Sequence, residues 1–120
     1  MFTPHRIGPT LVDALPHVLA KNLQPGDLVA HRGRPGFDEA GGRPVIRIDP
    51  SEEEGRVRII QPFLNPRYEG EESPLGAGAD QPIAVLPPYW PMGETRELTL
   101  ADVTAARDHI GTRAIEAPRT

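Results

Sequence analysis

The sequence contains no cysteine, only one lysine, and six aromatic residues among its 120. The absence of cysteine excludes disulfides and thiol chemistry. No apolar run approaches the roughly 20 residues that a membrane-spanning helix needs. Residues 1–9 also lack the apolar region of a signal peptide. We therefore expect no membrane partner and, by default, a cytoplasmic location.

Glycine and proline are frequent, with 12 and 15 residues respectively. The share of Leu, Ile, Val and Phe lies just above the range that is typical of disordered chains. This composition predicts one domain with a core of modest size and long loops. The strong preference for arginine over lysine, with many Ala, Gly and Pro, is typical of a high-GC genome.

The formal net charge of −4 lies entirely in the second half of the chain, because acids and bases balance over residues 1–58. A mildly acidic chain has no general attraction for nucleic acids or anionic membranes. Any such binding needs a local basic patch.

Residues 1–22 allow two interpretations. A helix can begin with Asp13 as its N-cap and Pro16 in its first turn. The alternative is an extended segment over Val18–Ala20. This leaves open whether the segment is an extension or part of the core.

Residues 23–43 predict a turn, a strand and a loop. Pro25-Gly26 fits the centre of a type II turn, and the apolar run at residues 28–31 fits a strand that follows it. Residues 32–43 are rich in glycine, which favours a loop.

A β-hairpin over residues 44–60 is the clearest signal in the chain. Two β-branched runs, Pro44–Ile48 and Arg56–Ile60, flank a polar turn. Alternation assigns Ile46, Ile48, Val57 and Ile59 to one face, and Val45, Arg47, Arg56, Arg58 and Ile60 to the other.

Two further segments lie between this hairpin and the end of the chain's β region. Residues 65–81 have few apolar side chains and predict a long loop, either ordered and functional or mobile. Pro82–Leu86 predicts a short strand, and its proline favours an edge position.

Residues 99–110 predict a helix. Thr99 fits the N-cap and Asp102 the third position of a capping box. An apolar stripe runs through Leu100, Val103, Ala106 and Ile110, and Gly111 ends the helix.

Together these elements predict a mainly β fold with one or two helices. It is either a small SH3-like barrel or a bent antiparallel sheet with a C-terminal helix. The turn-strand-hairpin order of residues 23–86 resembles the opening of many SH3-like small barrels, a resemblance to an architecture that implies no family. We divide the chain into an N-terminal extension or helix (1–22), a β domain (23–92) with a 65–81 loop, a C-terminal helix (93–114) and a frayed tail (115–120).

Motifs for catalysis, metals and phosphates are missing. Ser51 and Ser73 stand outside any nucleophile motif, the four histidines are isolated in the sequence, and no glycine-rich segment matches a phosphate loop. The acidic clusters at Glu52–Glu54 and around Glu71 are typical of solvated turns. We therefore predict no catalytic residue, no metal ligand and no cofactor.

An arginine-rich hairpin face is one candidate functional surface. Arg47, Arg56 and Arg58 have the same parity in the predicted hairpin, and Arg43 matches it. Such a face can bind nucleic acid backbones. The alternatives are an acidic protein partner, or neutralisation of the face by the neighbouring acids Asp49 and Glu52–Glu54.

The aromatic run Pro87–Met92 is the second candidate, since it holds the only tryptophan. Its prolines favour an extended, polyproline-like segment. Trp and Tyr are common interface anchors, so Pro88, Tyr89, Trp90 and Met92 are the predicted partner-binding residues. In the alternative interpretation, Tyr89 and Trp90 fold back to fill the end of a small core.

The sequence thus favours a non-enzymatic protein-interaction or structural accessory module, for example one within a bacterial or phage assembly. Its partner is another protein or a second copy of itself. The alternative is a small β-barrel that binds nucleic acid through the arginine-rich hairpin face, and an enzyme ranks third.

Overall fold

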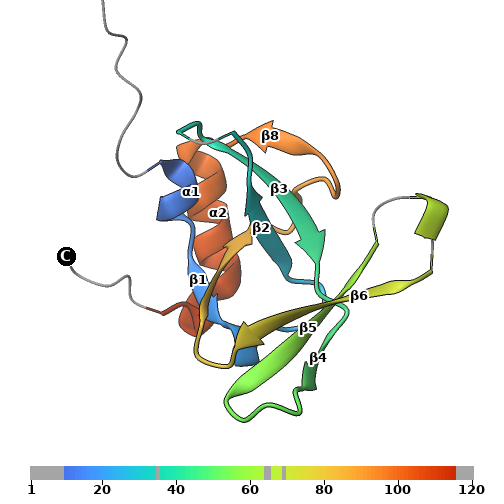
Figure 1. Cartoon of the computed structure of the whole chain (residues 1–120). Helices are drawn as coiled ribbons and strands as arrows, with labels where there is room; N and C mark the ends of the chain where they lie inside the picture. Colours follow the sequence, from blue (N-terminus) through green and yellow to red (C-terminus); the bar gives the residue numbers. More distant parts are fainter. Residues whose placement is uncertain (1–9, 35, 64–65, 69, 116–120) are drawn as a thin grey trace, which may run out of the picture.

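The computed structural model describes residues 10–34, 36–63, 66–68 and 70–115, which form two antiparallel sheets (Figure 1). The five-stranded sheet has the order β1-β7-β2-β3-β8, and the three-stranded sheet the order β4-β5-β6. The strands are β1 (His17–Leu19), β2 (Leu28–Arg32), β3 (Glu39–Pro44), β4 (Arg47–Pro50), β5 (Arg56–Pro62), β6 (Glu72–Gly78), β7 (Pro82–Leu86) and β8 (Thr95–Glu97). The helices are α1 (Leu11–Ala14) and α2 (Leu100–Ile110), with the 3₁₀ turns η1 (Ala20–Asn22), η2 (Pro66–Tyr68) and η3 (Gly111–Arg113).

The predicted mainly β fold with a C-terminal helix is confirmed. The strands of the described residues form two antiparallel sheets, of five and three strands, and no closed barrel is found among them. The predictions for residues 1–9 and for the tail at 116–120 lie outside the described residues.

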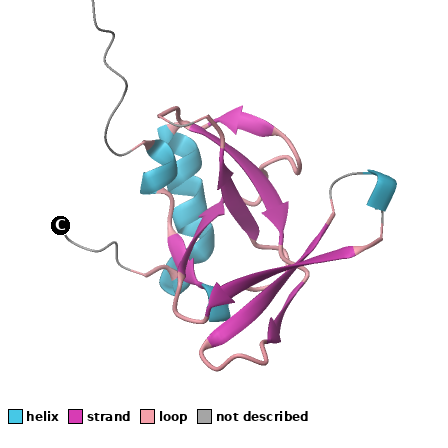
Figure 2. Ribbon diagram, viewed as in Figure 1, coloured by secondary structure: helices cyan, strands magenta, loops and turns pink. Residues whose placement is uncertain are grey.

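Both faces of the five-stranded sheet are covered at its centre. The helices α1 and α2 lie together on one side of it, and the three-stranded sheet packs on the other (Figure 2). Two apolar layers result. The layer between the sheets contains Val18, Val29, Val45, Ile59, Ala77, Ile83 and Val85, and Ile110, the last residue of α2, packs with it. The layer beneath the helices contains Val12, Leu15, Leu28, Ala40, Leu86, Trp90, Leu98, Val103 and Ala106.

Strand β7 occupies an interior position, which corrects the predicted edge. It pairs with β1 on one side and with β2 on the other. Its proline is tolerated because Pro82 is the first residue of the strand, where a missing N–H costs least. Neighbouring Val85 and Leu86 are both fully buried because each points into a different apolar layer.

Strand β3 corrects the predicted loop over residues 32–43. Glu39–Pro44 pairs along the whole of β2, from Arg32↔Ala40 to Leu28↔Pro44. Glycine stands in this strand because of close packing: a Cβ on Gly42 would lie 3.1 Å from Leu86 Cδ1.

The chain changes sheets at residues 45 and 46, where strict alternation fails. Val45 exchanges backbone hydrogen bonds with the 26–27 turn, and Ile46 N donates to Ile60 O (2.7 Å) at the start of β4. As a result Val45 is buried in the same layer as Ile59, although alternation assigns the two to opposite faces, and Ile46 is exposed. From Arg47↔Ile60 to Pro50↔Val57 the predicted hairpin is present in register.

The predicted 65–81 loop contains strand β6, which pairs with β5 from Arg56↔Gly78 to Pro62↔Glu72. Its few apolar residues reflect an edge strand with one partner. The N-terminal segment from Thr10 to Asn22 belongs to the core, and its extended alternative is correct near Val18. Asp13 is the third residue of α1 and not the N-cap, which is Thr10.

Helix α2 confirms the predicted caps. Asp102 N donates to Thr99 Oγ1, and Gly111 ends the helix with φ 57°. Val103, Ala106 and Ile110 are buried, but Leu100 is 70% exposed and lies outside the apolar stripe. The predicted type II turn is also present, with Gly26 at φ 92° and Asp27 N donating to Gln24 O.

The close approach at Gly42 predicts a sharp contrast between two strand glycines. Gly42→Ala should lower the free energy of unfolding by about 1–3 kcal/mol because its Cβ crowds Leu86 and Trp90 in a closed layer. At Gly76 a Cβ meets only the exposed end of Arg56, so Gly76→Ala should be neutral or stabilise by up to about 1 kcal/mol. Urea unfolding of the two variants measures both values, and equal effects would contradict the packing described.

Candidate functional site

The aromatic run Pro87–Met92 folds as a turn rather than as an extended segment. Trp90 N donates to Pro87 O (3.0 Å), which closes the turn. The Trp90 side chain is only 4% exposed, packs in the layer beneath the helices and donates from Nε1 to Ala40 O (3.2 Å). Trp90 therefore serves the core, as the alternative interpretation expected for it.

The other residues of this run remain on the surface. Pro88 is exposed, and Tyr89 and Met92 are each 59% exposed. The Tyr89 hydroxyl donates to Asp102 Oδ1 (2.5 Å), which raises the pKa of Tyr89 and fixes its ring at the start of α2. The turn thus presents a small exposed surface of Pro88, Tyr89 and Met92, which we call the turn surface.

The predicted arginine-rich hairpin face is divided between the two sheets. Arg47, Arg56 and Arg58 lie in the three-stranded sheet, whereas Arg43 lies in β3 of the five-stranded sheet. Arg47 is neutralised, because it donates two hydrogen bonds to Glu72 (2.6 and 2.8 Å) and two to Asp49. These bonds hold the pKa of Glu72 below its usual range.

Acids accompany part of the remaining face. Arg56 Nε lies 3.5 Å from Glu53 Oε2, and Arg58 stands directly across from Asp49 in the β4–β5 ladder. This arrangement agrees with a solvated face that is largely neutralised within the sheet.

Arg43 has a different environment. Its Nε is the single buried side-chain nitrogen or oxygen without a hydrogen-bond partner in the described part of the chain. Burial of His31, followed by the charge of Arg43, lowers the pKa of His31 and so disfavours the charged imidazolium. Arg43 is therefore the one positive charge of this pair, and it lies apart from the arginines of the hairpin.

Sequence reasoning missed the outer part of the β5–β6 hairpin, which projects away from the body and carries η2 at its tip (Figure 1). Phe63 and Tyr68 are 37% and 40% exposed there, and Leu75, which stands opposite Ile59 on the edge strand β6, is 42% exposed. The Phe63 and Tyr68 rings contact each other, with centroids 5.2 Å apart. We call these three side chains the arm surface. The apolar residues at 63 and 75 could have indicated this surface. They were not connected with each other, because residues 65–81 were predicted to form a loop and not a strand that pairs with β5.

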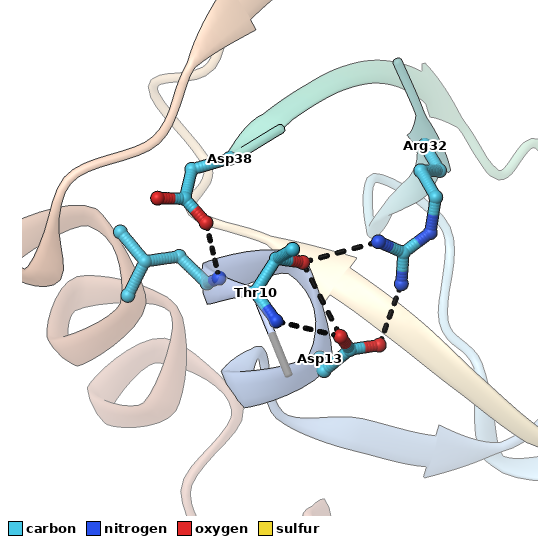
Figure 3. A network of polar contacts seen from close by, with 5 residues as sticks. Thr10, Asp13, Arg32 and Asp38 are labelled. Atoms are coloured by element: carbon cyan, nitrogen blue, oxygen red, sulfur yellow. Dashed lines mark hydrogen bonds and ion pairs between the residues drawn. The ribbon is translucent and has the colours of Figure 1, made fainter. Parts of the chain in front are cut away.

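A polar network attaches α1 to the β2–β3 hairpin (Figure 3). Leu11 N donates to Asp38 Oδ1 (2.7 Å), and Arg32 donates to both Thr10 Oγ1 (3.0 Å) and Asp13 Oδ1 (2.5 Å). Thr10 N also donates to Asp13 Oδ2 (2.8 Å). The hydrogen bond from Thr10 N–H, together with Arg32, lowers the pKa of Asp13 despite its partial desolvation.

A buried carboxylate anchors the C-terminal end. Asp27 is 3% exposed and accepts from Arg113 Nη1 and Nη2 (2.7 and 3.0 Å) and from Gln24 N (2.8 Å). His109 Nε2 lies 4.0 Å away, beyond hydrogen-bond distance. The fully paired carboxylate ties η3 to the turn that precedes β2.

No group of three or more His, Asp or Glu side chains among the described residues can hold a metal ion. None of the helices in the described part has the length and apolar character needed to span a bilayer. Comparisons with family models, curated proteins and solved structures find nothing that matches this chain.

The α1 network predicts a pH-dependent contribution to stability. Because the folded pKa of Asp13 is lowered, its contribution is complete above the unfolded pKa of about 3.9 and is lost as the pH falls through the folded value. Asp13→Asn should therefore cost about 1 kcal/mol at pH 7, the scale of a capping interaction, and much less near the acid limit of folding. The urea unfolding midpoints of the wild type and of Asp13→Asn, measured from pH 7 down to the acid limit of folding, test this prediction. A difference between the two midpoints that does not change with pH would contradict the role of Asp13.

Proposed function

We propose that this chain is a non-enzymatic protein-interaction module that binds a partner protein through the arm surface (Phe63, Tyr68 and Leu75). The observation that carries the proposal is that apolar side chains of the β5–β6 hairpin are exposed beside the core. Ile59 and Leu75 are direct cross-strand partners, yet Ile59 is fully buried and Leu75 is 42% exposed.

The pairing of β5 with β6 shows which face of the hairpin carries Phe63 and Leu75. Residues 59, 61 and 63 of the β5 segment alternate onto one face, and Ser73 and Leu75 lie opposite them. On β5 this face packs against the five-stranded sheet at Ile59, whereas Leu75, beside Ile59 on the edge strand β6, and Phe63, just after the end of β5, are exposed. Covering each of the two apolar side chains in a complex would contribute on the order of 1 kcal/mol.

Charge favours one kind of partner. The tip of the arm, residues 62–72, carries three glutamates and one arginine in its sequence. Glu72 is paired with Arg47, and Glu71 is exposed. An apolar groove with a basic rim complements such a tip, and complementary charge selects partners and speeds association.

The turn surface of Pro88, Tyr89 and Met92 is the second candidate contact. It is smaller than the predicted partner-binding set because Trp90 serves the core, and the Tyr89 hydroxyl already has an intramolecular acceptor. Nucleic-acid binding has less support, since the best-placed arginine of the three-stranded sheet, Arg47, is held by two carboxylates.

Matched double variants distinguish the two surfaces. A partner recovered from the source organism by photo-crosslinking is purified and titrated against the wild type, against Phe63→Ser/Leu75→Ser and against Tyr89→Ser/Met92→Ser. The arm variant should weaken binding at least tenfold, about 1.4 kcal/mol, because its two apolar side chains are lost. The turn variant should bind like the wild type.

Three results would contradict the proposal. If only the turn variant loses affinity, the contact is the turn surface. If crosslinks from residue 68 join only copies of this chain, and light scattering shows a stable oligomer, the module self-associates. If the chain binds DNA or RNA with steep salt dependence, and loses that binding on Arg58→Gln, the nucleic-acid alternative is correct.

A further inference from the structure

A cavity of about 580 Å³ lies where the N-terminal segment, the start of β7 and the end of α2 meet. Its size falls within the range of small-molecule pockets. Apolar side chains form most of the wall, among them Leu15, Pro16, Ala114 and Ile115. Leu15 and Pro16 are buried, so they provide a closed apolar floor.

Backbone hydrogen bonds hold the walls of this cavity together. Ile115 N donates to His17 O (2.9 Å), which closes the C-terminal segment onto the free edge of β1. Val85 N donates to Pro16 O (3.0 Å), which joins the floor to β7. The cavity is therefore formed before any ligand enters, which lowers the cost of binding.

Arg107 supplies a cation at the cavity. Its Nη2 donates to Ala14 O (2.9 Å), and it has no carboxylate partner within the described residues. A guanidinium has five N–H donors, so four remain available to a ligand. The one acid that lines the cavity, Asp13, is already paired with Arg32 and Thr10.

We propose that this cavity binds a small organic acid with an apolar body. The carboxylate accepts hydrogen bonds from Arg107, and the apolar body lies against Leu15, Pro16 and Ile115. An unpaired guanidinium beside a preformed apolar wall recognises this chemistry because the charge orients the acid and the wall removes its chain from water. The inference is independent of the arm surface.

Titration of the full chain with three ligands of equal chain length tests it. Octanoate, octanol and octyltrimethylammonium are added, with binding followed by amide NMR shifts and by calorimetry. Octanoate should bind more tightly than octanol, octyltrimethylammonium should bind most weakly, and the shifts should map to residues 13–17 and 107–115.

Arg107→Gln should weaken octanoate binding by about tenfold to a hundredfold while leaving octanol unchanged, since it removes a hydrogen bond to a charged group. Arg58→Gln is the matched control, because it makes the same charge change on the distant three-stranded sheet and should bind octanoate like the wild type. Ala114→Phe, which fills the cavity, should abolish the binding of both ligands.

Four results would overturn the inference. These are equal affinity for octanoate and octanol, equal loss in the two arginine variants, shifts confined to other surfaces, and no saturable binding of octanoate below its micelle concentration. None of them bears on the arm surface, so the two proposals fail separately.

Discussion

The need to cover both faces of the five-stranded sheet governs this fold. At its centre, neighbouring residues of β2 and of β7 are buried on opposite sides, Leu28 and Val85 among them. A chain with few large apolar residues meets this need with two thin layers in which backbone and side chain approach closely, as at Gly42. The same need explains why the only tryptophan fills the layer beneath the helices instead of serving as a surface anchor.

The two candidate binding features occur where this covering ends. On one side of the sheet, the core covers Ile59 of β5 but leaves Leu75, its partner on the edge strand β6, exposed. On the other side, α2 ends at Ile110, and the following segment reaches β1 through the hydrogen bond from Ile115 to His17. The space between them is the cavity beside Arg107. Both features are thus consequences of a core that is too small to cover the whole molecule.

Local signals in the sequence predicted the elements that depend on local chemistry. The capping box at Thr99 and the Pro25-Gly26 turn are fixed by residues within one turn of each other. The sequence did not reveal β3 or β6, because the glycines at 41 and 42 suit a loop equally well unless their distant neighbours are known. The sheet change at Val45 was missed for the same reason, since its hydrogen bonds run to a turn 18 or 19 residues earlier. The prediction of Trp90 as a partner-binding residue was wrong, because a tryptophan in the sequence fits an interface anchor and a core residue equally well.

Native-state hydrogen exchange tests most directly whether the doubly covered sheet is the stable centre and the arm lies outside it. Amides of Leu28, Val29 and Ile83–Leu86 should exchange only through global unfolding, because they lie at the buried centre of the sheet, where β2 pairs with β3 and β7 and where β7 pairs with β1 and β2. Amides in the outer arm, such as that of Phe63, which donates to Glu71 O, should exchange through local opening with a lower free energy. Equal protection of the arm and β7, or faster exchange in β7 than in the arm, would contradict this account.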